Sequence, residues 1–179
     1  ATSGDTQLGG TDMDNKIIDF LVEDFRRKNG SDLRKDATAM QRLRDAAEKA
    51  KIELSSVPQT AINLPFITAD SSGPRHLEVT LTRAKLEELV QSVLDRLEQP
   101  IRTALSDAKL SPRDINRIIL VGGPTRMPCV RERFKQIIQR EPEYGVDPME
   151  CVAIGASIQG GIIGGEFKGE IVAVDVTPL

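Results

Sequence analysis

The sequence predicts an α/β protein, and three observations lead to that expectation. Hydrophobic periodicity over residues 14–97 follows the order helix, helix, β-hairpin, helix. The nearly all-apolar run Arg117–Val121 is typical of a strand buried on both faces of a sheet. Two glycines and a helical pattern follow that run, which gives the strand–turn–helix order of α/β folds.

Two amphipathic helices are expected first, over residues 14–28 and about 36–54. Asp12 or Asp14 can cap the first helix, because a short carboxylate accepts hydrogen bonds from free backbone N–H groups. In the second helix, the residues that recur at helical spacing and are expected to form a buried stripe are Met40, Leu43, Ala47, Ala50 and Leu54.

Residues 60–82 change to a period of two, which predicts a β-hairpin. Ile62, Leu64 and Phe66 alternate with other residues on its first strand and are expected to share the inner face. Thr82 can cap the third helix that follows. Pro100 is expected to kink or restart that helix, because proline lacks the N–H that a helix interior needs.

The last third of the chain is expected to contain two more helices and a second strand. One helix begins near Pro128, since proline suits the first helical position. The next begins at Asp147, where Asp-Pro-Met-Glu combines a cap, a first-turn proline and a reciprocal carboxylate. Its many small residues predict close packing. Residues 171–174 are expected to form a second buried strand.

Composition excludes several classes of protein. The 179 residues carry a net charge of −3 and only 3% aromatic side chains, which does not favour nucleic-acid binding. No apolar run is long enough to span a membrane, so no membrane association is expected. Cys129 and Cys151 are too few for a disulfide framework. We interpret both as small buried residues of a protein in a reducing, cytoplasmic compartment.

The turn Gly122-Gly123 is the first candidate site. Two glycines after a buried strand let a ligand approach the backbone at the edge where α/β sheets bind ligands. Arg126 can stack on a base or pair with an anion. A tight turn and a solvated arginine would give the same pattern. The turn is not one of the two common glycine-rich phosphate loops.

Glu48, Lys51 and Ser55 form the second candidate site. Their spacing places them in one column of a helix, which we expect to lie well away from the buried stripe. A carboxylate, an ammonium and a hydroxyl can grip a ribose and a base edge by hydrogen bonds. An ordinary ion pair beside a helix-end serine is the alternative interpretation.

Residues 26–51 contain nine basic and four acidic side chains, a local balance of +5. A basic face can attract an anionic ligand or an acidic partner, although a solvated helix surface is the commoner outcome of such a run. Catalytic groups and metal sites are not expected. There is no nucleophile elbow, and His76 has no Ser or Cys partner in a motif.

Taken together, these segments resemble the seventy-kilodalton heat-shock (DnaK-type) chaperones. The resemblance covers the whole chain in order. The matching blocks are Gly4–Gly10, Ala46–Ser56, Ile67–Asp70, Leu81–Lys85, Ile119–Pro128, Val152–Ala156 and Asp175–Leu179.

The resemblance implies lobe II of an actin-like ATPase fold. Residues 11–90 resemble its upper helix–hairpin–helix subdomain. Residues 1–10 and 91–179 resemble an incomplete lower α/β subdomain. Lobe I, with the family's catalytic lysine, phosphate loops and Mg²⁺-organising aspartates, and the peptide-binding domain are not among these residues. We therefore expect no catalytic residue and no metal ligand here.

The resemblance also assigns roles to the candidate residues. Glu48 and Lys51 resemble the pair that holds the ribose of ATP or ADP, and Ser55 resembles the residue that hydrogen-bonds the adenine. Ile52 stands where the family places a residue against the base. The other matching positions are the turn Gly122 and Gly123 under the sugar and phosphates, the adenine-stacking Arg126 and its neighbour Met127. Pro124 and Met149 depart from the family's pattern and weaken the expected nucleotide contacts.

The function that the resemblance implies is the adenosine-binding part of an ATP-driven folding chaperone, without hydrolysis by this chain alone. Mg²⁺ would then be needed only with lobe I. The alternative is a protein-interaction module on residues 11–90 that a nucleotide exchange factor binds. In the parent protein, the implied partners also include a J-domain co-chaperone and the peptide-binding domain. A sugar-kinase-like enzyme is a third alternative, but it would need an aspartate base and phosphate hairpins that are not visible in this sequence. An exposed edge at 117–121 also predicts some dimerisation.

Overall fold

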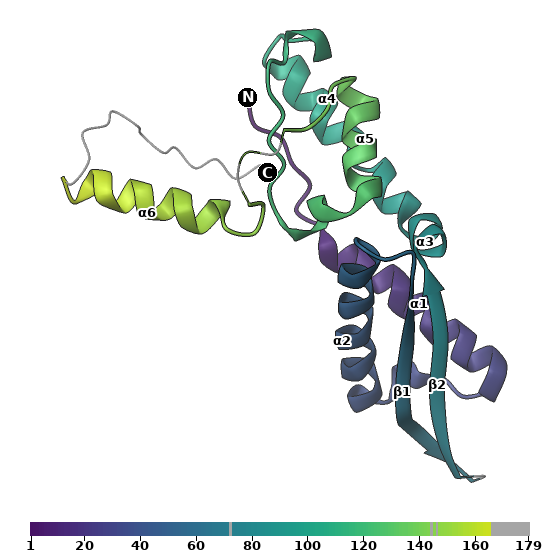
Figure 1. Ribbon diagram of the computed structural model, residues 1–179. Helices are drawn as coiled ribbons and strands as arrows, with labels where there is room; N and C mark the ends of the chain where they lie inside the picture. Colours follow the sequence, from purple (N-terminus) through teal and green to yellow (C-terminus); the bar gives the residue numbers. More distant parts are fainter. Residues whose placement is uncertain (72, 144, 146, 166–179) are drawn as a thin grey trace. The chain divides into compact units, whose positions relative to one another are not determined.

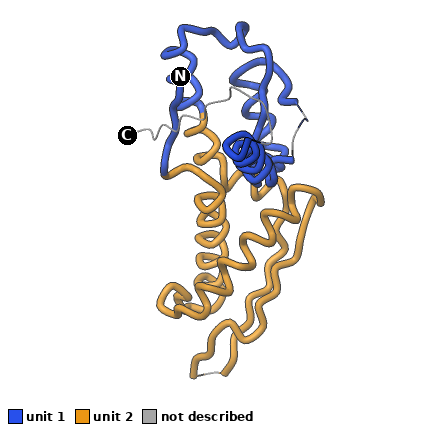
Figure 2. The backbone as a smooth tube through the Cα atoms, turned by 90° about the vertical axis from the view of Figure 1, so that its left-hand side faces the viewer, with its two compact units in different colours: residues 1–6, 98–179 blue, residues 7–97 orange. Residues whose placement is uncertain are grey.

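The computed structural model describes residues 1–71, 73–143, 145 and 147–165. The chain divides into two compact units, one of residues 7–97 and one of residues 1–6 and 98–179 (Figure 2). The subdomain boundaries that the family resemblance implies, at residues 11–90, stay a prediction.

The 7–97 unit has the predicted order of helix, helix, hairpin, helix (Figure 1). The two strands are antiparallel, with Gln59 opposite Thr82 at one end and Asp70 opposite Gly73 at the other. The elements are α1 (Gly10–Asn29), the 3₁₀ turn η1 (Leu33–Lys35), α2 (Ala37–Leu54), β1 (Gln59–Asp70), β2 (Gly73–Thr82) and α3 (Arg83–Asp95).

One apolar core holds these elements together. Helix α1 packs against α2, α3 and β2, and α2 packs against β1. Burial of large aliphatic and aromatic side chains is the main force that stabilises such a unit. The largest fully buried side chains are those of Phe25, Ile17, Leu21, Leu33, Leu43, Leu54, Leu81, Leu86, Val22 and Val90.

Side-chain caps fix the starts of two helices where the sequence predicts them. The Asp36 carboxylate accepts from the N–H groups of Thr38 and Ala39 at the start of α2 (2.9 and 3.0 Å). The Thr82 hydroxyl caps α3. Helix α1 corrects the expectation, because it begins at Gly10 and already contains both aspartates that were candidate caps. Asp12 lies in the first turn, where it accepts from the Gly9 N–H.

Phe66 does not share the inner face of β1, as the alternation predicted. A β-bulge between Leu64 and Thr68 places three residues of β1 opposite a single residue of β2, and Phe66 has a positive φ of 52°. The side chain of Phe66 is therefore 67% exposed, while Ile67 takes the inner position. The Arg42 guanidinium donates to the carbonyls of Pro65 and Phe66, and His76 Nδ1 accepts from the Phe66 N–H.

The second unit contains α4 (Glu98–Asp107), two 3₁₀ turns, α5 (Pro128–Ile138) and α6 (Cys151–Ile163). The 3₁₀ turns are η2 (Pro112–Asp114) and η3 (Gly123–Arg126). The predicted break near Pro100 is confirmed, because α3 ends at Asp95 and Pro100 lies in the first turn of α4. Pro128 is the first residue of α5, also as predicted.

The buried strand predicted over residues 117–121 is not found. Ile119 forms a single parallel bridge with Glu143, and Ile119 and Val121 are about half exposed. Leu120 alone of this run is buried. Within the described residues no further strand lies beside the run, so no sheet covers its two faces. The other predicted strand, at residues 171–174, lies outside the described residues.

Helix α6 begins at Cys151, four residues after the predicted start at Asp147, and none of its side chains is buried. The close packing expected from its small residues is therefore absent from the part of the chain that the structure describes. Cys129 and Cys151 are both half-buried rather than fully buried. Of the helices described, none combines the length and the apolar character needed to cross a bilayer.

Candidate functional site

Three of the predicted nucleotide-binding residues are accessible on α2. Glu48 is exposed and Ser55 is half-buried at the end of the helix, where its hydroxyl donates to the Lys51 carbonyl (3.2 Å). Between them, Ile52 is 62% exposed, which is unusual for a large aliphatic side chain. This stretch of α2 therefore offers an apolar surface beside a carboxylate and a hydroxyl.

Lys51 lies differently from what the helical column predicted. Its side chain faces the core and is only 8% exposed, because Lys51 follows Ala47 by one helical turn and joins the buried stripe. Its Nζ donates to the Asp14 carboxylate (2.8 Å) and to the Gly10 carbonyl (3.2 Å), both on α1. The expectation that the whole column lies away from the core is therefore wrong for its middle member.

The other predicted residues form one turn in the second unit. Gly122 has φ 92° and ψ 150°, a conformation that only glycine adopts without strain. The Thr125 hydroxyl donates to the Gly122 carbonyl (2.7 Å), and Thr125 is buried, so the turn is held from inside. Gly123 begins η3, Arg126 ends it with a half-exposed guanidinium, and Met127 is buried behind it.

The structure adds Asp147 to this turn, a residue whose sequence context indicated only a helix cap. Arg126 Nη2 contacts both carboxylate oxygens of Asp147 (2.7 and 2.8 Å). A hydrogen bond from the Met149 N–H, and then the Arg126 guanidinium, hold the pKa of the Asp147 carboxyl below its usual range. The two residues are 21 positions apart, so the spacing gave no signal for this pair.

The family model described as "Hsp70 protein" matches residues 1–179, the whole chain. The chain belongs to the Hsp70 family. Its relatives include proteins named "Chaperone protein DnaK" from three organisms. They are 61% identical in Cenarchaeum symbiosum, 60% in Picrophilus torridus and 58% in Nitrosopumilus maritimus. Each match covers 100% of this chain but only 27%, 29% and 28% of the relative.

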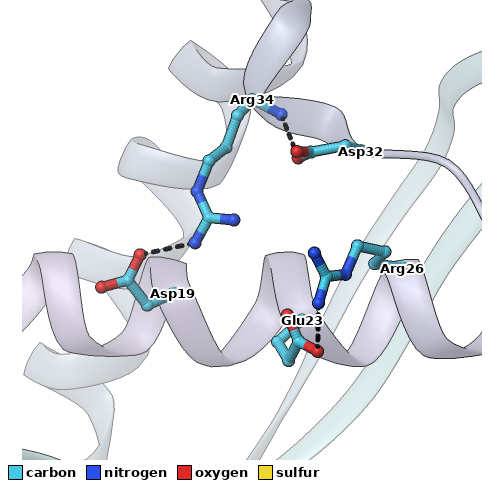
Figure 3. A network of polar contacts seen from close by, with 5 residues as sticks. All are labelled: Asp19, Glu23, Arg26, Asp32 and Arg34. Atoms are coloured by element: carbon cyan, nitrogen blue, oxygen red, sulfur yellow. Dashed lines mark hydrogen bonds and ion pairs between the residues drawn. The ribbon is translucent and has the colours of Figure 1, made fainter.

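The basic run of this Hsp70 chain does not form an unpaired cationic face. Acidic side chains of α1 neutralise much of it. Arg34 donates to Asp19 (2.9 Å), and Arg26 donates to Glu23 (3.0 Å) (Figure 3). The bond to Asp19 raises the pKa of the Arg34 guanidinium. The local net charge of +5 overstates the positive potential of this surface, because the acidic residues that pair with the run lie just before residue 26.

Asp24 is the most buried acid of this group, at 8% exposed, and it pairs with Arg27 and Lys28 (2.7 and 2.6 Å). Burial alone would raise the pKa of Asp24, but the hydrogen bonds from Lys28 and Arg27 outweigh it, so the pKa is lowered. A carboxyl whose pKa is lowered in the folded state stabilises the fold at pH values above its unfolded pKa of about 3.9. This stabilisation is lost as the pH falls through the lowered pKa.

We therefore expect Asp24→Asn to lower the free energy of unfolding by about 1 kcal/mol at pH 7, because the two partner cations remain solvated. The difference from the parent chain should shrink as the pH falls from about 5 through the lowered pKa. Urea unfolding of both chains between pH 7 and pH 3 measures it. A difference that stays constant over this range would show that Asp24 does not titrate with a lowered pKa.

The conformation of Gly122 gives a second prediction. A Cβ atom at Gly122 would meet no atom within 4 Å, so Gly122→Ala tests backbone strain alone. We expect a loss of about 1–3 kcal/mol in thermal or urea unfolding. Gly155→Ala in α6 is the control, with equal space and no positive φ. It should be neutral or stabilising by up to about 1 kcal/mol. Equal effects of the two substitutions would contradict the assigned conformation.

Proposed function

We propose that this chain is the adenosine-binding part of an Hsp70 nucleotide-binding domain, corresponding to lobe II of the actin-like ATPase fold. In this proposal ATP or ADP is bound through its adenosine, and residues outside this chain supply the phosphate contacts, Mg²⁺ and hydrolysis. The proposed subdomains are residues 11–90 and residues 1–10 with 91–179.

The observation that carries the proposal is the surface of α2 around Ile52. A large aliphatic side chain left exposed between a carboxylate and a hydroxyl suits a nucleoside, which has an apolar ring and hydrogen-bonding edges. Glu48 would accept from ribose hydroxyls, and Ser55 would bond the adenine. The Lys51 ammonium group already donates to Asp14 and Gly10, so in this proposal its position beside the ligand is set by those two contacts.

The turn Gly122–Met127 supports the same proposal by its own geometry. Its backbone permits close approach at Gly122, and Arg126 has a planar, half-exposed guanidinium that can stack on a base. Met127 is buried, so we assign it to the support of the turn and not to direct contact.

Calorimetric titration with adenosine and ADP tests the proposal. We expect weak, saturable binding with Kd on the order of 0.1–1 mM, because half of a site desolvates little of the ligand. Arg126→Ala should weaken binding about tenfold, which corresponds to the loss of one stacking contact. The control Arg117→Ala removes the similarly exposed Arg117–Glu143 pair and should leave affinity unchanged. ATP hydrolysis well above background, lost in Arg126→Ala, would contradict the proposal.

A second candidate function is a protein-interaction module that a nucleotide exchange factor binds through residues 11–90. The observation that favours it is Phe66, which is exposed yet fixed. Two carbonyls at the bulge accept from Arg42, and the Phe66 ring meets His76 edge-on with centroids 4.7 Å apart. Rigid exposed aromatic side chains are typical anchors of protein interfaces.

Phe66→Ala separates the two functions. We expect it to weaken binding of an exchange factor that acts on DnaK-type chaperones about tenfold or more, while adenosine binding is unchanged. Competition between that factor and ADP provides the second measurement. Unchanged factor binding by Phe66→Ala would remove Phe66 from the interface.

A further inference from the structure

The charge of Arg126 is already matched by a partner in the free chain. Its Nη2 lies 2.7 and 2.8 Å from the two carboxylate oxygens of Asp147. Both side chains are about half exposed, so a ligand can reach the pair. A guanidinium paired in this way keeps its planar face, but its net charge is balanced.

Asp147 is itself fixed to the same turn. Its Oδ1 accepts from the Met149 N–H (2.8 Å), and the next carbonyl, that of Pro148, accepts from the Gly122 N–H (2.8 Å). A Cβ atom at Gly123 would lie 3.1 Å from Met149 Sδ, so this segment also packs against the glycine turn. Residues 147–149 therefore form a backing for Gly122–Arg126, and the carboxylate is held where it meets Arg126.

We infer that Asp147 is a positioning residue that selects what Arg126 recognises. It fixes the plane of the guanidinium and neutralises its charge, so that Arg126 offers a flat face to a base and little attraction to a phosphate. This inference rests on the nucleotide binding proposed above. It goes further, because it makes the preference for the nucleoside part of the ligand depend on one carboxylate.

Removing the Asp147 carboxylate should change the preference of the site between adenosine and ADP. With Asp147 present, Arg126 should contribute about equally to the binding of adenosine and of ADP. Without the carboxylate, Arg126 carries an unbalanced positive charge and can turn toward the phosphates. ADP should then gain relative to adenosine, and the gain should be sensitive to salt, because exposed charges are screened by ions.

Asp147→Asn is the matched test, because the amide oxygen can still accept from the Met149 N–H while the charge is removed. Titrations with adenosine and with ADP, at low salt and at about 0.5 M NaCl, give the ratio of the two affinities. We expect the ratio to shift toward ADP by about threefold to tenfold at low salt and to return at high salt. Glu143→Gln disrupts the Arg117 pair and should leave the ratio unchanged.

A second variant separates positioning from support of the turn. Asp147→Ala also leaves the Met149 N–H without its acceptor, so it should add a loss that adenosine and ADP share. An equal loss for both ligands in Asp147→Asn, or no change in their ratio, overturns the inference while the proposed function stands. If the parent chain binds neither adenosine nor ADP, the proposed function fails and the inference falls with it.

Discussion

Phe25→Ala is expected to lower the free energy of unfolding of the 7–97 unit by about 3–5 kcal/mol. Phe25 is the largest fully buried side chain of that unit, at 1% exposed. Its ring lies on the α1 face that packs against α2, α3 and β2, so truncation opens a cavity among elements that share one core. A small domain is stable by about 5–15 kcal/mol, so this single change removes a large part of its stability.

Phe66→Ala is the matched control, because it removes the same ring from an exposed position of the same unit. It should cost no more than about 1 kcal/mol, the size of an edge-on aromatic contact. Urea unfolding followed by circular dichroism measures both variants. Similar losses for the two substitutions would contradict the core described for this unit.

Lys51→Met is expected to cost about 3–5 kcal/mol, because it leaves a charge without its partner in a nearly buried place. The Asp14 side chain is only 15% exposed, and the Lys51 ammonium lies 2.8 Å from its carboxylate. The same substitution removes the donor to the Gly10 carbonyl. Both losses fall at the contact between α1 and α2.

The double variant Lys51→Met with Asp14→Leu should recover part of that loss, because no charge then stays buried. Unfolding of the parent, both single variants and the double variant gives the coupling free energy between the two residues. Simple additivity of the two single changes would mean that Lys51 and Asp14 do not form the ion pair that places Lys51 on the buried face of α2.

Local signals predicted the 7–97 unit well. The buried stripe of α2, the helix start near Asp36, the cap at Thr82 and the alternation in the hairpin each depend on neighbours in the sequence. The residues that give such signals lie within a few positions of one another, so the signals can be recognised from a single sequence. Family membership was also predictable, because seven ordered blocks of residues carried it.

Several features that the sequence did not predict depend on non-local contacts. The outward turn of Phe66 depends on a bulge that Arg42 and His76 stabilise from other elements. The burial of Lys51 depends on where α1 lies, and Asp147 reaches Arg126 across 21 residues. Residues 117–121 have strand composition, yet strand pairing needs neighbours that the described part of the chain does not supply.

Titration of the chain with ADP, followed residue by residue through backbone amide shifts, is the decisive experiment for an adenosine site in this chain. We expect weak saturable shifts clustered at Glu48, Lys51 and Ser55 and across Gly122–Arg126, with the Phe66 bulge unaffected. Shifts confined to other residues, or no saturable shift at millimolar ADP, would contradict an adenosine site within this chain.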